Sequence, residues 1–267
     1  MRRRPLGKTG LSVTELALGT WGLCGDGYGP VAESEQDKVI DRARALGIAL
    51  FETADSYAAG DMERRLGERL KADDAARIVT KIGTDLDAPV PRKRFDAKYL
   101  EAAFDGSRKR LGRDVLDVAL LHNPSEDAIK AGAAADFMAG LVDAGKLRAW
   151  GVSAGSVEVA RAAIAKGAQV LSLAVSVLAS SDVAALATDI DQKEVGVLAH
   201  SVLAYGLLCG HWSADKVFAD NDHRAERWTS DELRRRLRQL DALRPAVGGP
   251  VLTLRSAALR YVLHTAR

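Results

Sequence analysis

The sequence is poor in cysteine and has no excess charge of either sign. Cys24 and Cys209 are its only cysteines among 267 residues, far apart and outside any CxxC spacing. Two such thiols form neither a disulfide framework nor a metal cluster, and they fit a reducing cytoplasm. The 38 Lys and Arg residues balance 36 Asp and Glu residues, to a net charge of +2. This balance argues against a disordered acidic tail and against a strongly basic nucleic-acid-binding module.

Long apolar runs are also missing from the sequence. No stretch approaches the ~18 uninterrupted apolar residues that a membrane-spanning helix needs. The basic start at Arg2-Arg3-Arg4 is not followed by the apolar segment of a signal peptide, because Thr14-Glu15 and Asp26 interrupt it. We therefore expect a cytoplasmic protein without membrane or nucleic-acid partners. No low-complexity linker divides the chain, so we predict one domain over residues 1–267.

Short apolar runs alternate with longer amphipathic segments along the chain. Seven runs have the composition of strands buried on both faces. They span residues 15–19, 48–51, 77–80, 116–121, 149–152, 169–175 and 195–199. Segments with helical spacing span residues 34–45, 60–72, 97–111, 131–144, 157–165, 183–191, 231–243 and 252–263. This alternation predicts parallel strands joined by helices, as in a (β/α)8 TIM barrel.

An eighth strand is not recognisable in this pattern. A parallel barrel needs its last strand to close against the first, because open apolar edges are otherwise exposed. We expect that the eighth strand lies beyond residue 267 or that another element covers the gap, which invites a homo-oligomer. The segment 211–229 is polar and contains Trp212, Phe218 and Trp228, which predicts a long loop at the functional end of the barrel.

Polar residues follow several of the predicted strands, at the end where α/β barrels carry their chemistry. Glu52 and Tyr57 follow the second strand, Lys81 follows the third and His122 follows the fourth. A Lys ammonium beside a Tyr hydroxyl is expected to lower the pKa of the Tyr and make it a proton donor or acceptor near neutrality. A carboxylate would hold the Lys in place. These residues alone predict an acid–base site.

Motifs along the whole chain resemble those of the aldo-keto reductases, NADPH-dependent barrels that reduce aldehydes and ketones. The strongest are Arg4-Pro5-Leu6-Gly7-Lys8-Thr9-Gly10-Leu11, Gly19-Thr20-Trp21, Thr53-Ala54-Asp55-Ser56-Tyr57, Glu63-Arg64-Arg65-Leu66-Gly67 and Gly151-Val152-Ser153. The resemblance implies a catalytic tetrad of Asp, Tyr, Lys and His. Tyr57 matches its proton donor, Lys81 its cation and His122 the residue that orients the carbonyl, while Glu52 stands in the place of the Asp.

The resemblance also implies a set of residues that bind NADPH. They are Gly19, Thr20, Trp21, Ser153, Ser172, His200, Ser201 and Leu203. Ala154 stands where the family has Asn, Ser172 where it has Gln, and His200 where an aromatic side chain, usually Tyr, stacks on the nicotinamide. The family's pyrophosphate and 2′-phosphate contacts lie largely after the eighth strand, in a segment that we expect to be missing here. These departures weaken the expectation of NADPH binding.

The leading hypothesis is reduction of a small-molecule carbonyl with NADPH, in a cleft lined by Trp21, Trp212 and Trp228. Two alternatives stay open. The first is a cofactor-independent lyase, isomerase or cyclase that keeps the Tyr, Lys and His of the tetrad. The second is a non-catalytic binding or regulatory protein. His211 and His223 lack the spacing of metal ligands, so no metal is expected.

Overall fold

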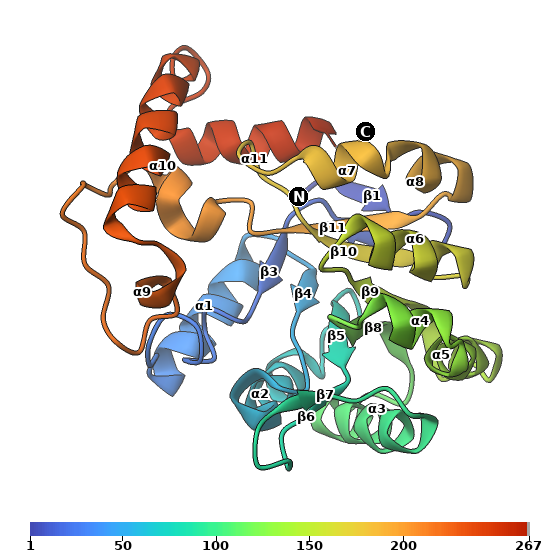
Figure 1. The fold of residues 1–267 in the computed structure, drawn as a ribbon. Coiled ribbons are helices and arrows are strands. Elements are labelled where there is room, and N and C mark those ends of the chain that lie inside the picture. The colour runs from blue at the N-terminus through green and yellow to red at the C-terminus, as the bar shows by residue number, and fades with distance from the viewer. Residues whose placement is uncertain (266–267) are drawn as a thin grey trace.

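The central element of the computed structural model, which describes residues 1–265, is a sheet of seven parallel strands (Figure 1). The strands are β3 (Ala17–Gly19), β4 (Leu50–Glu52), β5 (Arg77–Ile82), β8 (Leu116–His122), β9 (Leu147–Ser153), β10 (Val170–Ala174) and β11 (Gly196–His200). Their order in the sheet is β11-β10-β9-β8-β5-β4-β3, so each strand pairs with its neighbours in the chain. This is the strand order of a TIM barrel, and the seven predicted strands are confirmed.

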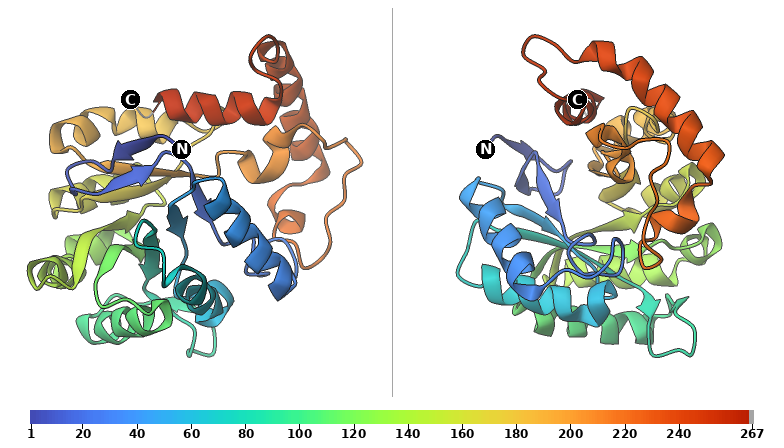
Figure 2. Two further views of the ribbon diagram at one scale, coloured as in Figure 1. Left: turned by 180° about the vertical axis from the view of Figure 1, so that it is seen from behind. Right: turned by 90° about the vertical axis from the view of Figure 1, so that its left-hand side faces the viewer.

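Helices surround this sheet (Figures 1 and 2). They are α1 (Glu33–Ala45), α2 (Asp61–Leu70), α3 (Ala97–Leu111), α4 (Glu126–Lys130), α5 (Ala133–Asp143), α6 (Val157–Ala165), α7 (Ser181–Ala185), α8 (Ala187–Lys193), α9 (Arg224–Arg227), α10 (Ser230–Leu243) and α11 (Leu254–Thr265). The 3-10 helices are η1 (Tyr57–Gly60), η2 (Ala204–Cys209) and η3 (Arg244–Ala246). Residues 183–191, predicted as one helix, belong to α7 and α8. The predicted loop 211–229 contains the short helix α9.

Two antiparallel hairpins lie outside the sheet and are absent from the sequence prediction. The first pairs β1 (Arg3–Pro5) with β2 (Ser12–Thr14), and the second pairs β6 (Thr84–Asp85) with β7 (Arg92–Lys93). Both hairpins consist of very short strands with mostly polar or charged side chains. Such strands carry no apolar alternation from which they could be recognised.

Local sequence signals account for several helix ends. The Asp96 side chain accepts a hydrogen bond of 3.0 Å from the Tyr99 backbone N–H and caps α3. Gly47 and Gly145, which follow α1 and α5, have φ values of 81° and 68°. Glycine occupies this left-handed region without the steric cost that other residues meet there.

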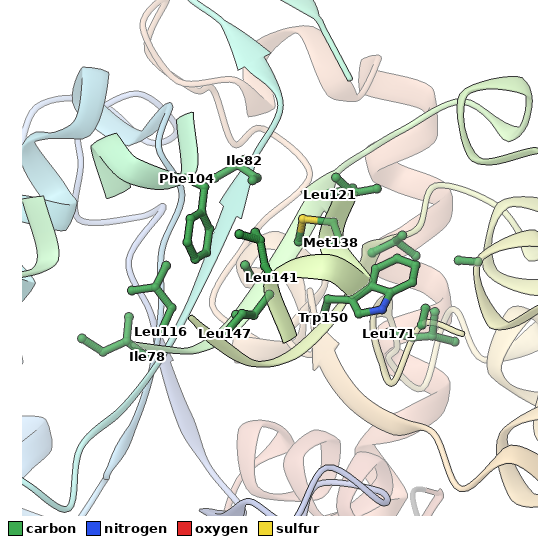
Figure 3. Close-up of a cluster of buried hydrophobic side chains, with 14 of the residues drawn as sticks. Ile78, Ile82, Phe104, Leu116, Leu121, Met138, Leu141, Leu147, Trp150 and Leu171 are labelled. Carbon is green, nitrogen blue, oxygen red and sulfur yellow. The ribbon is translucent and has the colours of Figure 1, made fainter. Parts of the chain in front are cut away.

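The main apolar core lies between the strands and the helices (Figure 3). Ile78, Leu121 and Trp150 point outward from β5, β8 and β9, and they pack with Phe104 of α3 and Met138 of α5. Because strand side chains alternate, the residues between these positions point into the barrel. At the amino-terminal ends of the strands the barrel interior is filled by apolar side chains. At the carboxyl ends, here called the upper part of the barrel, the interior holds polar side chains.

The sheet is open between β3 and β11 in the described part of the chain, since these two strands are not paired. A cavity of about 890 Å³ runs along this seam. The N-terminal hairpin and α11 flank the seam (Figure 2), and Arg4 donates a hydrogen bond of 3.3 Å to the Leu263 carbonyl oxygen. None of the described helices has the length and apolar character needed to cross a membrane.

Candidate active site

The candidate site is the upper layer of inward-pointing residues in the barrel. Glu52 ends β4, Lys81 lies near the end of β5, and His122 ends β8. Ser153 lies opposite both His122 on β8 and Ser172 on β10. Because all these strands are parallel, their carboxyl ends meet at one rim. The structure therefore brings together side chains that are far apart in the sequence.

Lys81 is the centre of this layer, with a side chain only 6% exposed. Its ammonium forms an ion pair with Glu52 and donates hydrogen bonds to the Tyr57 hydroxyl, at 2.9 Å, and to the Thr53 carbonyl oxygen, at 3.3 Å. An ammonium has three N–H donors and cannot accept a hydrogen bond, so these three partners use its full capacity. Lys81 is thus held in one position by three different groups.

Gly19 explains how Glu52 fits where the tetrad has a shorter Asp. A Cβ atom added at Gly19 would lie 3.1 Å from the Glu52 Oε2 atom, which is closer than nearly all such contacts. Because Gly19 on the neighbouring strand β3 has no side chain, the additional methylene group of Glu52 has room there. The longer side chain can then reach the Lys81 ammonium.

The Tyr57 hydroxyl differs from the sequence prediction, because its pKa is raised above the ordinary Tyr value. Burial is the main cause, with a smaller contribution from the Cys24 thiol. The prediction of a lowered pKa is wrong, since it considers the charge of Lys81 alone. In the structure the Glu52 carboxylate balances that charge, and the burial of the phenol favours its neutral form. Tyr57 therefore carries its proton at neutral pH.

Two opposing effects act on the ionisation of Lys81. Burial, and to a smaller degree the Lys93 ammonium, lower the pKa of Lys81 below its ordinary value. The contacting Glu52 carboxylate acts in the opposite direction, because an adjacent opposite charge favours the charged ammonium. The Glu52 contact therefore helps to keep a buried Lys charged.

A left-handed turn follows Tyr57 and sets its position. Ala58 and Ala59 have φ values of 47° and 51°, a conformation that costs non-glycine residues free energy, of order 1 to 3 kcal/mol each. The Asp26 carboxylate accepts a hydrogen bond of 2.8 Å from the Ala58 N–H and so holds the turn. The Cys24 Sγ atom lies 3.4 Å from the same carboxylate and 3.0 Å from the Trp21 carbonyl oxygen, so its single proton is shared between these two acceptors. Sequence reasoning missed this support for Tyr57.

His122 lies beside Tyr57, with ring centroids 6.2 Å apart in an edge-on arrangement. Burial, Lys81 and Lys93 lower the pKa of His122 to about 2. The imidazole is therefore neutral at physiological pH and carries a single N–H. Its Nδ1 atom lies 3.4 Å from the Thr84 hydroxyl oxygen.

Asn123 is a residue of this rim that sequence reasoning did not select. Its Oδ1 atom accepts a hydrogen bond of 2.9 Å from the Ser153 hydroxyl, and its backbone has a positive φ of 52°. The amide of Asn123 is therefore held next to Ser153 at the rim. Its position directly after His122, at the end of β8, is the sequence signal that could have identified it.

The other predicted cofactor residues lie in four places. Ser172 is buried on β10, next to Ser153. His200 lies beside the Ser201 hydroxyl, 3.1 Å from its Nδ1 atom, and burial followed by Lys81 lowers its pKa to about 4. The Thr20 hydroxyl donates to the Glu52 carbonyl oxygen at 3.0 Å. Leu203 packs into a separate apolar cluster formed by η2, α10 and α11.

Aromatic side chains gather where the loop after β11 approaches β3. Trp21 and Tyr28 pack against His223, at centroid distances of 4.6 and 5.1 Å. Trp212 and Trp228 lie 5.4 Å apart and pack into the cluster that contains Leu203. Trp21 therefore contacts the loop through His223, whereas Trp212 and Trp228 pack against each other within the loop. Among the described residues, no group of three or more His, Cys, Asp or Glu side chains is arranged to hold a metal ion.

Comparison with known proteins identifies relatives of this chain. It is 30% identical over 161 residues to an aldo-keto reductase of Bacillus subtilis, a match that covers 59% of this chain and 48% of the relative. It is 36% identical over 160 residues to a 6-dehydroglucose reductase of Novosphingobium aromaticivorans, covering 56% of this chain and 50% of the relative. The matched region thus spans about half the length of these curated relatives.

Solved structures with the same barrel cover almost the whole chain. A glycerol dehydrogenase of Gluconobacter oxydans superposes with a TM-score of 0.86 at 22% identity, covering 99% of this chain and 83% of that one. The holo form of an aldo-keto reductase from Bacillus halodurans gives a TM-score of 0.81 at 22% identity, covering 100% and 84%. The sequence model of the aldo/keto reductase family matches residues 15–267. This chain therefore belongs to the aldo/keto reductase family.

Proposed function

We propose that the protein reduces the carbonyl group of a small molecule to an alcohol, with NADPH as the hydride donor. One observation carries the proposal. The Tyr57 hydroxyl, protonated at neutral pH, lies 2.9 Å from a Lys81 ammonium that Glu52 holds in place. A proton donor next to a fixed cation suits a reaction in which an oxygen atom gains negative charge. The reductase names of the curated relatives support the same reaction class.

The residues at the rim fit the nicotinamide end of NADPH. The Ser153 hydroxyl uses Asn123 Oδ1 as its acceptor, and the Asn123 amide nitrogen makes no hydrogen bond within the described residues. A carboxamide group needs both donors and acceptors, and Ser153, Asn123 and the buried Ser172 offer them. The seam cavity reaches Gly19, Ser172, His200 and Ser201. We therefore assign Ser153, Asn123 and Ser172 to the carboxamide and His200 to the face of the ring.

Each residue of the tetrad has a separate part in the proposed reaction. NADPH, when bound, supplies the hydride that is added to the carbonyl carbon. Tyr57 gives its proton to the carbonyl oxygen as negative charge develops there. Lys81 stabilises the phenolate that this transfer leaves behind, and Glu52 keeps Lys81 charged and oriented. His122 is neutral and positions the carbonyl oxygen.

The direct test follows NADPH oxidation in the presence of a panel of aldehydes and ketones. We expect turnover by the wild type and a loss of about 10²- to 10⁴-fold in kcat for Tyr57→Phe, which removes only the hydroxyl. Nicotinamide fluorescence measures cofactor binding separately. NADPH binding without turnover would favour a regulatory protein, and NADPH-independent, Tyr57-dependent turnover would favour an acid–base enzyme. Either result contradicts the proposal.

We also propose that the protein works in the cytoplasm, where its two unpaired thiols would stay reduced. Both Cys24 and Cys209 are free, and burial raises the pKa of Cys24 to about 11, which makes its thiol unreactive. The homo-oligomer expected from the sequence stays a prediction, for which sedimentation velocity is the measurement.

A further inference from the structure

The hairpin β6–β7 places one lysine next to the candidate site without a carboxylate partner. In the basic run 92–94, Arg92 and Arg94 lie 3.5 and 3.6 Å from the Asp85 carboxylate, and Arg94 also pairs with Asp96. Lys93 makes no ion pair within the described residues. It donates a hydrogen bond of 2.7 Å to the hydroxyl of Thr84, the residue opposite it in the hairpin.

The same Thr84 hydroxyl also faces the imidazole of His122, with its oxygen 3.4 Å from Nδ1. An ammonium can only donate a hydrogen bond, so Thr84 Oγ1 must accept the one from Lys93. The hydroxyl proton of Thr84 is then available for Nδ1, provided that Nδ1 carries a lone pair. The three groups form a short chain in which each donor meets an acceptor.

The charge of Lys93 favours the same arrangement. A positive charge near Nδ1 stabilises a lone pair that points toward it and destabilises an N–H bond in that direction. Lys93 and Lys81 both help to keep His122 neutral, while Asp55 is the acidic group that acts on Lys93. A neutral imidazole has a single N–H. With Nδ1 as the acceptor, that proton is on Nε2, which has no hydrogen-bond partner within the described residues.

We propose that Thr84 and Lys93 are positioning residues that hold His122 in its Nε2–H tautomer. His122 then offers the Nε2 proton to the carbonyl oxygen that Tyr57 protonates. This second part rests on the proposed reductase function, whereas the tautomer itself does not. The hairpin residues thus act on the reaction through His122 without contacting the substrate.

Nitrogen-15 NMR of the full chain with labelled histidine tests the tautomer in the absence of cofactor and substrate. His122→Asn identifies the resonances of His122. We expect a neutral imidazole at pH 7 with Nδ1 unprotonated and the proton on Nε2. Thr84→Val keeps the side-chain shape but removes the hydroxyl, and it should move the Nδ1 chemical shift toward that of a protonated ring nitrogen. Thr84→Ser should restore the wild-type spectrum. A protonated Nδ1 in the wild type would overturn the proposal.

Two further measurements separate this role from a structural one. Lys93→Met, an exposed substitution, should move the His122 resonances in the same direction as Thr84→Val without lowering the unfolding temperature. For carbonyl reduction, we expect kcat/KM to fall by about three- to tenfold in Thr84→Val and to recover in Thr84→Ser. Identical His122 resonances in the wild type, Thr84→Val and Lys93→Met would overturn the proposal. Absence of turnover in every variant would contradict the reductase function, while the NMR result would still decide the tautomer.

Discussion

The Lys81 ammonium donates a hydrogen bond of 2.9 Å to the Tyr57 hydroxyl while Glu52 balances its charge. The pairing with Glu52 has two consequences for the proposed reaction. The phenol keeps its proton before the reaction, because it is buried and the adjacent cation, which would favour the phenolate, is compensated. The same cation is already in place when the proton leaves, so the phenolate is stabilised without movement of a side chain. Glu52 thus acts on Tyr57 indirectly, by setting the charge and the position of Lys81.

Glu52→Gln should shift the pH dependence of the reaction. The substitution keeps the side-chain shape but removes the charge that opposes the effect of burial on Lys81, so the pKa of Lys81 falls further. Lys81 then loses its proton at a lower pH. We expect the alkaline limb of the kcat/KM profile to move down by about one pH unit or more.

The matched control for this prediction is Glu15→Gln, which removes a carboxylate that pairs with Arg2 and Arg4 on the N-terminal hairpin. Its alkaline limb should coincide with that of the wild type. An alkaline limb in Glu52→Gln that stays in place or moves up would show that Glu52 does not maintain the charge of Lys81.

Asp55 should make the protein less stable as the pH rises. Burial and the Glu63 carboxylate raise the pKa of Asp55 from 3.8 to about 7, and its Oδ1 atom is buried without a hydrogen-bond partner. The folded protein therefore binds more protons than the unfolded chain between these two values. The free energy of unfolding then falls as the pH rises through this interval, by at most about 4 kcal/mol.

Asp55→Asn removes this ionisation and keeps the side-chain shape. Chemical denaturation at several pH values should show that the wild type loses stability relative to Asp55→Asn between pH 4 and pH 7. Parallel stability curves for the two proteins would mean that Asp55 ionises normally in the folded state.

Asn123→Gly should weaken NADPH binding. Glycine tolerates the positive φ at this position, so the change removes the amide without straining the backbone. Loss of a neutral hydrogen bond predicts an increase in Kd of about three- to tenfold, measured by nicotinamide fluorescence. Ser181→Ala removes an exposed hydroxyl on α7 and should leave Kd unchanged. An unchanged Kd in Asn123→Gly would remove Asn123 from the carboxamide site.

Glu63→Gln should destabilise the fold by about 3 kcal/mol, because it leaves Arg110 without its partner. Glu63 is fully buried, accepts a hydrogen bond of 2.7 Å from Arg110 and another of 2.5 Å from Thr80, the neighbour of Lys81. Asp241→Asn breaks an exposed pair with Arg244 and should cost about 0.5 kcal/mol or less. Urea denaturation of the two variants makes the comparison. Equal losses of stability would show that the buried pair has no special role.

Much of the barrel can be predicted because its strands are buried on both faces. The run 116–121 is apolar except for Asp117, and β8 (Leu116–His122) occupies it almost residue for residue. The hairpin β6–β7 could not be predicted, since its short strands consist of polar and charged residues. The prediction of one domain over residues 1–267 stays a prediction.

The candidate site could be predicted only in part. Tyr57, Lys81 and His122 were found because each follows a recognisable strand. The raised pKa of Tyr57 was not, because it depends on burial and on the contact between Lys81 and Glu52. Asn123 was missed because its contact with Ser153 depends on the register between neighbouring strands.

The most direct test of the central claim is the transfer of deuterium from NADPH labelled at C4 of the nicotinamide. With a carbonyl substrate from the panel, we predict that the wild-type protein forms an alcohol carrying one deuterium on the former carbonyl carbon. Tyr57→Phe should form the same labelled product at least 10²-fold more slowly. A product without deuterium, or a labelled product formed equally fast by Tyr57→Phe, would contradict the account.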